Sequence, residues 1–378
     1  MNIGIDIRVL ARGARTGVEE YTISLLSHLL PIGPDINYQL FYNAYQKVRL
    51  DYPWLSLNNV FLRDFKIPNR FLFFSSRYFN QPKIDKILGN VDVYFNPHFF
   101  NSPLSKKCRK IITFHDLSFE RYPEFFSLRK RLWQKFLMNA REEAKKADKI
   151  IAVSHSTKED LIDIYGIEPE KIDVIYSGIS SQFRQIIDNQ EETKRIKTKY
   201  GLPDDFILYL GTIEPRKNII GLIKAFELLR NDYSIKLVLA GVSGWLEQDI
   251  FKRAKESKYQ KDIVFTGLIE PEDRPYIYNL ALIFVYPSFF EGFGFPPLEA
   301  MACGIPVIVS NSSSLSEAVG DSALMVDPNN TDEIAWAMKI TLTDTDLRKV
   351  FIKKGLEQVN KFSWQKTAEK TLDIIRTF

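Results

Sequence analysis

The feature that most constrains this chain is an alternation of short apolar runs with longer helical stretches, which occurs in two blocks along its 378 residues. The short runs have the length of buried strands, and the stretches between them have the length and spacing of helices. Strands that alternate with helices form parallel sheets with helices on both faces. The sequence therefore predicts an α/β protein with two doubly wound domains.

The strands expected in the first block are Ile3–Val9, Tyr38–Tyr42, Val91–Phe95, Lys110–Phe114, Lys149–Ser154 and Lys171–Tyr176. Those expected in the second block are Phe206–Leu210, Leu237–Ala240, Ile263–Thr266, Ile283–Tyr286 and Val307–Val309. A polar stretch without clear periodicity, 180–199, separates the blocks and is interpreted as a linker. We expect Rossmann-like domains over 1–180 and 200–360, followed by a terminal helix over 361–378.

The composition excludes several other classes of protein. Hydrophobic residues make up 45% and charged residues 26% of the chain, as in globular domains. Cys108, Cys303 and the four histidines are scattered without metal-ligand spacing, so no metal site is expected. The first residues lack the features of a signal peptide, and no apolar run has the length of a membrane span. The cytoplasm is the expected compartment.

The net charge is only +4, but it is uneven, because residues 106–149 contain 13 Lys and Arg against 6 Asp and Glu. The favoured interpretation is a solvated helix face above a buried stripe of Leu128, Leu132 and Phe136. The alternative is a basic amphipathic helix that contacts an anionic membrane peripherally. No nucleic-acid partner is expected, since basic and aromatic residues are not interleaved as in RNA-binding proteins.

Several distinctive residues lie in the segments that come after expected strands. They are Gly17, His115, Gly211, Thr212, Gly241 and Glu291. In open α/β sheets, ligands bind outside the carboxyl ends of the strands. A single glycine there often only makes a tight turn, but the whole set favours a ligand-binding cleft between the two domains.

The segment 286–308 has the strongest chemical pattern in the chain. Gly292 and Gly294 permit a tight backbone path after a strand, and Pro296 and Pro297 suit the first turn of a helix. The free backbone N–H groups at such a helix start attract phosphate.

Two carboxylates flank this turn, Glu291 before it and Glu299 on the helix. A carboxylate accepts hydrogen bonds well from the vicinal hydroxyls of a ribose or a hexose. Arg216 and Lys217 follow another strand, where two adjacent cations would neutralise a diphosphate. A diphosphate held in this way needs no metal ion, and the sequence contains no clear acidic metal motif.

With these motifs, the chain resembles the retaining glycosyltransferases of family 4, which have the GT-B fold of two Rossmann-like domains facing a central cleft. The resemblance rests on Glu291 and Glu299 with the residues between them, and on the Glu-Pro-Arg-Lys-Asn turn at 214–218. The segments 240–245, 265–267 and 310–321 also match, as does the closing 362–364. It runs from about the first residue to the last helix, which in this family crosses back to the N-terminal domain.

The resemblance implies an N-terminal acceptor-binding domain, a C-terminal nucleotide-sugar-binding domain, and a role for each matching residue. Arg216 and Lys217 would hold the donor diphosphate, Glu299 the ribose hydroxyls, and Glu291 the transferring sugar. Other donor contacts would come from Gly17, Gly241, Leu268, Gly292, Phe293, Gly294, Phe295 and Leu298.

His115, followed by Asp116, matches the family's His-Asp pair at a strand end, and it would orient the donor sugar or contact the acceptor. A structural histidine bonded to nearby backbone is the simpler alternative. The chain departs from the family in its first loop, 13–17, which has one glycine near the helix start, and at Thr212, where the family often has Arg. The second departure would leave Arg216 and Lys217 as the main phosphate contacts.

The implied activity is retaining, metal-independent transfer of a hexose from a nucleotide-sugar, without any other cofactor. Mannose from GDP-mannose is the first expectation, and a glycan or lipid-linked glycan at the inner membrane face is the expected acceptor. UDP- or dTDP-sugar donors, a GT-B sugar-nucleotide epimerase and a catalytically silent glycan-binding protein stay open. An NAD enzyme is not expected, because no Gly-x-Gly-x-x-Gly motif follows the first strand.

Overall fold

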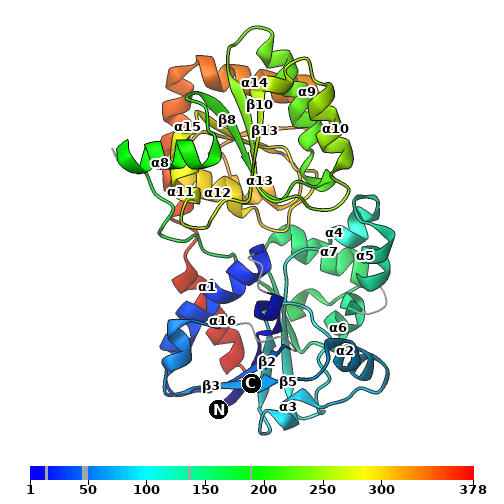
Figure 1. Ribbon diagram of the computed structural model, residues 1–378. Coiled ribbons are helices and arrows are strands. Elements are labelled where there is room, and N and C mark those ends of the chain that lie inside the picture. The colour runs from blue at the N-terminus through cyan, green and yellow to red at the C-terminus, as the bar shows by residue number, and fades with distance from the viewer. Residues whose placement is uncertain (13–15, 45–49, 135–137, 188–189) are drawn as a thin grey trace. The chain divides into compact units, whose positions relative to one another are not determined.

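The computed structural model describes residues 1–378 except 13–15, 45–49, 135–137 and 188–189. These residues form two compact units, each built on its own sheet (Figure 1). Unit 1 comprises Met1–Arg121, Leu128–Gly178 and Ser363–Phe378, and unit 2 comprises Tyr122–Ser127 and Ile179–Phe362.

Unit 1 contains a seven-stranded parallel sheet in the order β3-β2-β1-β4-β5-β6-β7. Its strands are β1 (Asn2–Asp6), β2 (Asn37–Asn43), β3 (Val60–Phe65), β4 (Val93–Asn96), β5 (Arg109–Phe114), β6 (Lys149–Ala152) and β7 (Ile172–Val174). The central strands are continuous apolar runs because helices cover both of their faces.

Helices of unit 1 cover the sheet in two layers that follow from right-handed crossovers. The chain runs from β1 to β2 in one direction and from β3 through β7 in the other, so α1 lies on the opposite face from the later helices (Figure 1). One face is covered by α1 (Gly17–Ile32). The later helices are α2 (Asn69–Tyr78), α3 (Ile84–Ile87), α4 (Ser118–Arg121), α5 (Leu128–Trp133), α6 (Ala140–Lys146) and α7 (His155–Tyr165). The terminal helix α16 (Trp364–Arg376) packs beside α1.

Unit 2 contains a six-stranded parallel sheet in the order β10-β9-β8-β11-β12-β13. Its strands are β8 (Phe206–Leu210), β9 (Lys236–Ala240), β10 (Ile263–Gly267), β11 (Ile283–Tyr286), β12 (Val307–Ser310) and β13 (Leu324–Val326). Its helices are α8 (Gln190–Tyr200), α9 (Ile219–Arg230), α10 (Gln248–Glu256), α11 (Arg274–Leu280), α12 (Phe295–Ala302), α13 (Ser314–Val319), α14 (Thr331–Thr343) and α15 (Thr345–Val359).

The boundary between the units differs from the expected linker over 180–199. The described residues of this stretch belong to unit 2, and 190–200 form helix α8. Only Ile196 and Tyr200 of this helix are buried, so its sequence is too polar for a clear helical pattern. The chain leaves unit 1 after Gly178 and returns at Ser363.

The expected buried stripe on the basic helix is wrong for the two residues that the structure describes. Leu128 and Leu132 on α5 are 72% and 56% exposed; Phe136 lies outside the described residues. The helix is short and pairs these leucines with three consecutive cations, Arg129, Lys130 and Arg131. Within the described ranges, no helix combines the length and the apolar character needed to cross a membrane.

Candidate active site

The sheet of unit 2 reverses its strand order between β8 and β11. These two strands pair directly, and the chain leaves them toward opposite edges of the sheet. The loops after β8 and β11 therefore diverge, and the space between them is where open α/β sheets bind ligands. Residues 211–218 and 287–294 form these loops.

Arg216, Lys217 and Glu291 come together at this point. Lys217 Nζ donates to Glu291 Oε1 at 2.6 Å, and Arg216 Nη1 donates to Glu291 Oε2 at 3.0 Å. Each cation thus takes a different oxygen of one carboxylate. Lys217 Nζ also donates to the Tyr286 hydroxyl at 2.8 Å.

A second carboxylate, which the sequence analysis did not single out, completes the cluster. Glu214 is buried, and its Oε1 accepts from Arg216 Nη2 at 2.8 Å and from Nε at 3.1 Å. Arg216 Nη1 also donates to the Phe290 carbonyl at 2.6 Å. The available signal was the spacing of Glu214 and Arg216 around Pro215, which begins the short 3-10 turn Pro215–Lys217.

The cluster holds two cations and two carboxylates, and its members shift each other's pKa. Burial alone would raise the pKa of Glu291, but the charges of Arg216 and Lys217 bring it down to about 2. Burial, reinforced by the neighbouring Arg216 charge, lowers the pKa of Lys217 from its ordinary value. Glu291 is therefore a carboxylate at neutral pH and a weak base.

Serine hydroxyls on the neighbouring loop and helix fix the backbone that carries Glu291. Ser314 Oγ donates to the Glu291 carbonyl at 2.9 Å, and Ser313 Oγ accepts from the Glu291 N–H at 2.8 Å. Ser310 and Ser312 both donate to the Ser288 carbonyl. The serine-rich segment that resembles the family thus positions the loop after β11.

Helix α12 begins at the end of this loop, and its first turn contains two prolines. Gly294 is its N-cap with a φ of +100°, and a Cβ there would meet Leu315 Cδ2 at 2.7 Å, so glycine is required. Pro296 and Pro297 lack N–H groups. Of residues 294–297 at this helix start, only Gly294 and Phe295 therefore carry a backbone N–H.

Glu299 lies on α12, where it is buried and accepts from the Tyr278 hydroxyl at 2.8 Å. Gly241, after β9, has a φ of +133°, and a Cβ there would meet the Gly211 carbonyl at 2.0 Å. Leu268, after β10, is exposed. Gly241 therefore makes a tight turn at its strand end, as a glycine there is expected to do.

Two residues of the expected donor set are packed into unit 2. Leu298 is fully buried, so its side chain offers no surface to a ligand. Phe293 is also buried, and its ring contacts those of Phe295 and Phe362. A donor contact from Phe293 would have to use its backbone.

Residues 122–127 come from the first half of the chain but belong to unit 2. Phe125 stacks on Phe289 with ring centroids 5.3 Å apart, and Trp245 Nε1 donates to the Phe125 carbonyl at 2.5 Å. The Tyr122 ring is tilted against the Phe290 ring, with centroids 5.6 Å apart. This segment therefore packs against the two residues that precede Glu291, a contact that no sequence pattern predicted.

His115 and Gly17 lie in unit 1. His115 Nε2 is 2.8 Å from the Pro97 carbonyl, which only accepts, so Nε2 carries a proton and Nδ1 is the acceptor of the neutral ring. Burial lowers the pKa of His115, which favours that neutral form. Its ring also meets those of Tyr21 and His98.

Gly17 begins α1, and a Cβ there would meet no described atom within 4 Å. Packing within unit 1 therefore does not explain the glycine. The rest of the glycine-containing loop, 13–15, lies outside the described residues.

No three His, Cys, Asp or Glu side chains of the described ranges gather as a metal site would require, and metal independence stays a prediction.

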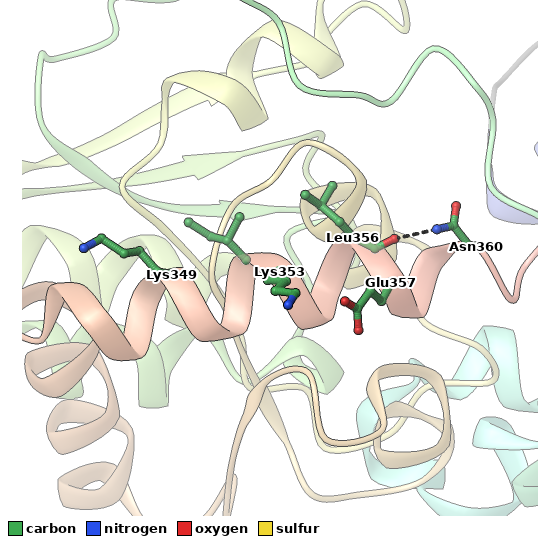
Figure 2. Close-up of a pocket in the computed structure, with 6 residues that line it drawn as sticks. Lys349, Lys353, Leu356, Glu357 and Asn360 are labelled. Carbon is green, nitrogen blue, oxygen red and sulfur yellow. Dashed lines mark hydrogen bonds between the residues drawn. The ribbon is translucent and has the colours of Figure 1, made fainter.

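A shallow hollow on the surface of unit 2 is lined by a different set of residues from the site at β8 and β11. Figure 2 shows that it follows one face of α15 and the residue after it. It is lined by Lys349, Ile352, Lys353, Leu356, Glu357 and Asn360. A single helix face does not enclose a ligand, so this hollow is not the candidate site.

Comparisons with known proteins agree with the two-part organisation. Residues 15–183 match the family described as Glycosyltransferase Family 4, and residues 190–358 match Glycosyl transferases group 1. The chain is 35% identical over 285 residues to O-antigen chain mannosyltransferase B of Escherichia coli, covering 74% of this chain and 73% of that protein. It is 36% identical over 245 residues to serotype-specific mannosyltransferase WbdA of Escherichia coli, covering 64% of this chain but only 30% of that longer protein.

Solved structures show the same fold at low sequence identity. Sucrose-phosphate synthase from Thermosynechococcus elongatus superposes with a TM-score of 0.77 at 20% identity, covering 100% of this chain and 98% of that one. Anabaena Alr3699/HepE in complex with UDP and glucose gives a TM-score of 0.73 at 17% identity, with 100% of both chains covered.

Proposed function

Because the chain belongs to the family 4 glycosyltransferases of GT-B fold, we propose that it transfers mannose from GDP-mannose to a growing glycan in cell-surface polysaccharide biosynthesis. The mannose assignment is supported by the names of its relatives, which include two mannosyltransferases at 35% and 36% identity. The GDP assignment follows from that sugar. The proposed acceptor is a glycan on a lipid carrier, met at the cytoplasmic face of a membrane that the chain contacts peripherally.

The observation that carries the proposal is the meeting of Arg216, Lys217 and Glu291 at the carboxyl ends of β8 and β11. A diphosphate bound there would be stabilised by both cations and by the start of helix α12. Glu291 would hold the cations in place before the donor binds, which is electrostatic preorganisation.

In the proposed reaction, the bond between the sugar C1 and the diphosphate oxygen breaks and a bond from C1 to the acceptor oxygen forms. The electron pair leaves with the diphosphate, whose growing charge Arg216 and Lys217 stabilise. The acceptor proton passes to a leaving phosphate oxygen, and the acceptor attacks the face that the diphosphate leaves, so the anomeric configuration is retained. Glu291 is not the nucleophile, since two hydrogen-bonded cations already occupy its carboxylate.

The proposed roles of the remaining residues follow from the family. Glu299 would bind the ribose beside Tyr278, and Gly241 and Leu268 would line the nucleotide. His115 would use Nδ1 to accept a hydrogen bond from a sugar or acceptor hydroxyl. None of these roles requires a metal ion.

The test is thermal stabilisation by GDP, UDP and dTDP, each with EDTA and then with magnesium, followed by product analysis with the matching sugar donor. A ligand that binds only the folded protein raises the melting temperature by mass action. We expect GDP to give the largest shift in EDTA, and mannose to reach the acceptor with its α-configuration kept. A larger shift with UDP or dTDP would refute the GDP assignment. Free sugar as the sole product would favour an epimerase, and no shift with any nucleotide would favour a silent binding protein.

A further inference from the structure

Helix α2 of unit 1 presents a row of aromatic side chains to solvent. Phe71, Phe74 and Tyr78 are 63%, 51% and 62% exposed, and Phe79, just after the helix, is 67% exposed. The spacings of three and four residues place the first three on one helix face. The Phe74 ring contacts those of Tyr78 and Phe79 at 4.8 and 5.9 Å. These four residues form a continuous patch, here called the aromatic face.

The other side of α2 is already packed into unit 1. Leu72, Ser75 and Ser76 are buried, and Leu72 belongs to a core cluster with Phe41 and Tyr94. The helix is therefore fixed to the sheet by its inner side, and the aromatic face is not part of the core. A contiguous apolar patch of this kind on a folded surface marks an interaction site.

Charges around the aromatic face indicate an anionic partner. Residues 66–83 contain Lys66, Arg70, Arg77 and Lys83 but no Asp or Glu, a net charge of +4. Arg70 and Arg77 lie on α2 itself, and the two lysines flank it in sequence. Phenylalanine and tyrosine interleaved with basic residues on one helix are typical of segments that lie in the headgroup region of anionic bilayers. Each basic side chain near such a surface adds attraction that salt weakens.

A second exposed segment has the same chemistry on the same side of the sheet. Leu128 and Leu132 project from α5 beside Arg129, Lys130 and Arg131. The crossovers from β3 to β4 and from β5 to β6 run in the same direction, so α2 and α5 cover the same face of the sheet (Figure 1).

We propose that the aromatic face of α2, assisted by the exposed leucines and cations of α5, docks unit 1 on the surface of an anionic lipid bilayer. The inference rests on the proposed function for its acceptor, a lipid-linked glycan, and it adds the surface by which the enzyme reaches that acceptor. Unit 1 should bind the bilayer even when neither the sugar donor nor the acceptor is present.

The test is co-sedimentation of the full chain with vesicles of phosphatidylcholine alone and with about one third phosphatidylglycerol, at low and high salt. We expect binding to the anionic vesicles only, with salt weakening it. Replacing Phe71, Phe74 and Tyr78 together by Ser should reduce the partition coefficient at least about tenfold, because the inserted apolar area is lost.

A matched control removes three exposed apolar side chains from unit 2, Leu228, Trp336 and Val350. Their combined replacement by Ser should leave vesicle binding unchanged. Circular dichroism and GDP-induced stabilisation establish that both triple variants are folded. A Tyr78→Trp variant gives an independent readout, since its fluorescence should shift to the blue on anionic vesicles.

Unchanged binding by the α2 triple variant would overturn the proposal, as would a wild-type chain that ignores anionic vesicles. A wild-type dimer that the same variant converts to monomers, without vesicle binding, would assign the aromatic face to a second copy of the chain instead. Failure of GDP binding with intact vesicle binding would count against the proposed function and leave the docking surface standing.

Discussion

The two sheets have the same strand order around their reversal points, and each carries a charged cluster there, yet the clusters differ in accessibility. In unit 1, Arg8 and Asp6 form a bidentate pair at the end of β1, with Nε to Oδ1 at 3.0 Å and Nη2 to Oδ2 at 2.5 Å. The rings of Phe41 and Phe100 cover the guanidinium. The side chains of Arg8 and Asp6 are 6% and 0% exposed.

In unit 2, the side chains of Arg216, Lys217 and Glu291 are 12%, 9% and 9% exposed. Lys217 Nζ lies 5.2 Å from the centre of the Tyr286 ring, and the flanking loop is held both by serine hydroxyls and by the ring contacts of Phe289 and Phe290. The same topology therefore gives an almost fully buried ion pair in unit 1 and a cluster with slightly more exposed side chains in unit 2. That remaining exposure distinguishes the candidate catalytic cluster from the structural pair.

The largest expected effect is on the stability of unit 1. Asp6→Ala leaves the buried Arg8 charge without its carboxylate and should cost about 3–5 kcal/mol of unfolding free energy. Urea denaturation measures the change in unfolding free energy. The control is Glu256→Ala, which removes one member of an exposed ion pair on α10 and should change the unfolding free energy by close to zero. GDP affinity of the remaining folded protein should be unchanged. Wild-type stability in Asp6→Ala would contradict a structural role for the pair.

The next effect should fall on catalysis in unit 2. Lys217→Ala removes one cation from the leaving diphosphate and should lower kcat/KM about 100-fold or more. Its stability loss should be smaller than that of Asp6→Ala, because Arg216 still pairs with Glu291. Steady-state kinetics with GDP-mannose measures this, and Lys349→Ala on α15 is the control. Wild-type turnover by Lys217→Ala would remove this lysine from the site.

A third prediction concerns pH. Because Arg216 and Lys217 depress the pKa of Glu291 to about 2 from its ordinary 4.5, its ionised form stabilises the folded state. That contribution is complete above the ordinary value and is lost as pH falls from 4.5 toward 2. Glu291→Gln should therefore flatten the acid limb of a plot of unfolding free energy against pH, while Glu256→Gln should not. An unchanged acid limb would show that Glu291 does not pair with these cations in solution.

The smallest expected effect tests the open position in unit 1. Gly17→Ala should change stability by no more than about 0.5 kcal/mol, since a Cβ there meets no described atom within 4 Å. If the donor or acceptor approaches this backbone, kcat/KM should still fall about tenfold through misplacement of the ligand. Thermal melting and kinetics on the same preparation separate the two effects. An unchanged kcat/KM would show that neither donor nor acceptor approaches the backbone at Gly17.

The sequence predicted the buried parts of the fold well, because central parallel strands are continuous apolar runs. It missed β3 and β13, which are edge strands; β3 alternates little and exposes most of its side chains. It also missed α8, whose few apolar residues leave no clear helical period.

For the candidate site, strand-end position was enough to select Arg216, Lys217 and Glu291. Their pairing with each other could not be predicted, because it depends on how two loops 74 residues apart in sequence converge. The role of Glu214 could not be predicted either, because only the folded loop brings its carboxylate to Arg216. The exposure of Leu128 and Leu132 depends on what the rest of unit 1 leaves uncovered, which local spacing does not record.

The chain crosses between the units at 121/122, 127/128, 178/179 and 362/363, which bears on how such enzymes can be recombined. In unit 1, Gly178 lies against the backbone of Trp364, and in unit 2, Ile179 N–H donates to the Phe362 carbonyl at 3.3 Å. Residues 179–362 are therefore inserted into unit 1 with both of their ends at one place, while 122–127 add a second, short contribution to unit 2. A chimera that exchanges unit 2 between relatives needs matched junctions at 178/179 and 362/363, and a matching 122–127 segment, because this segment packs on Phe289 and Phe290. Fusing halves at a single point would separate α16 from α1, against which it packs.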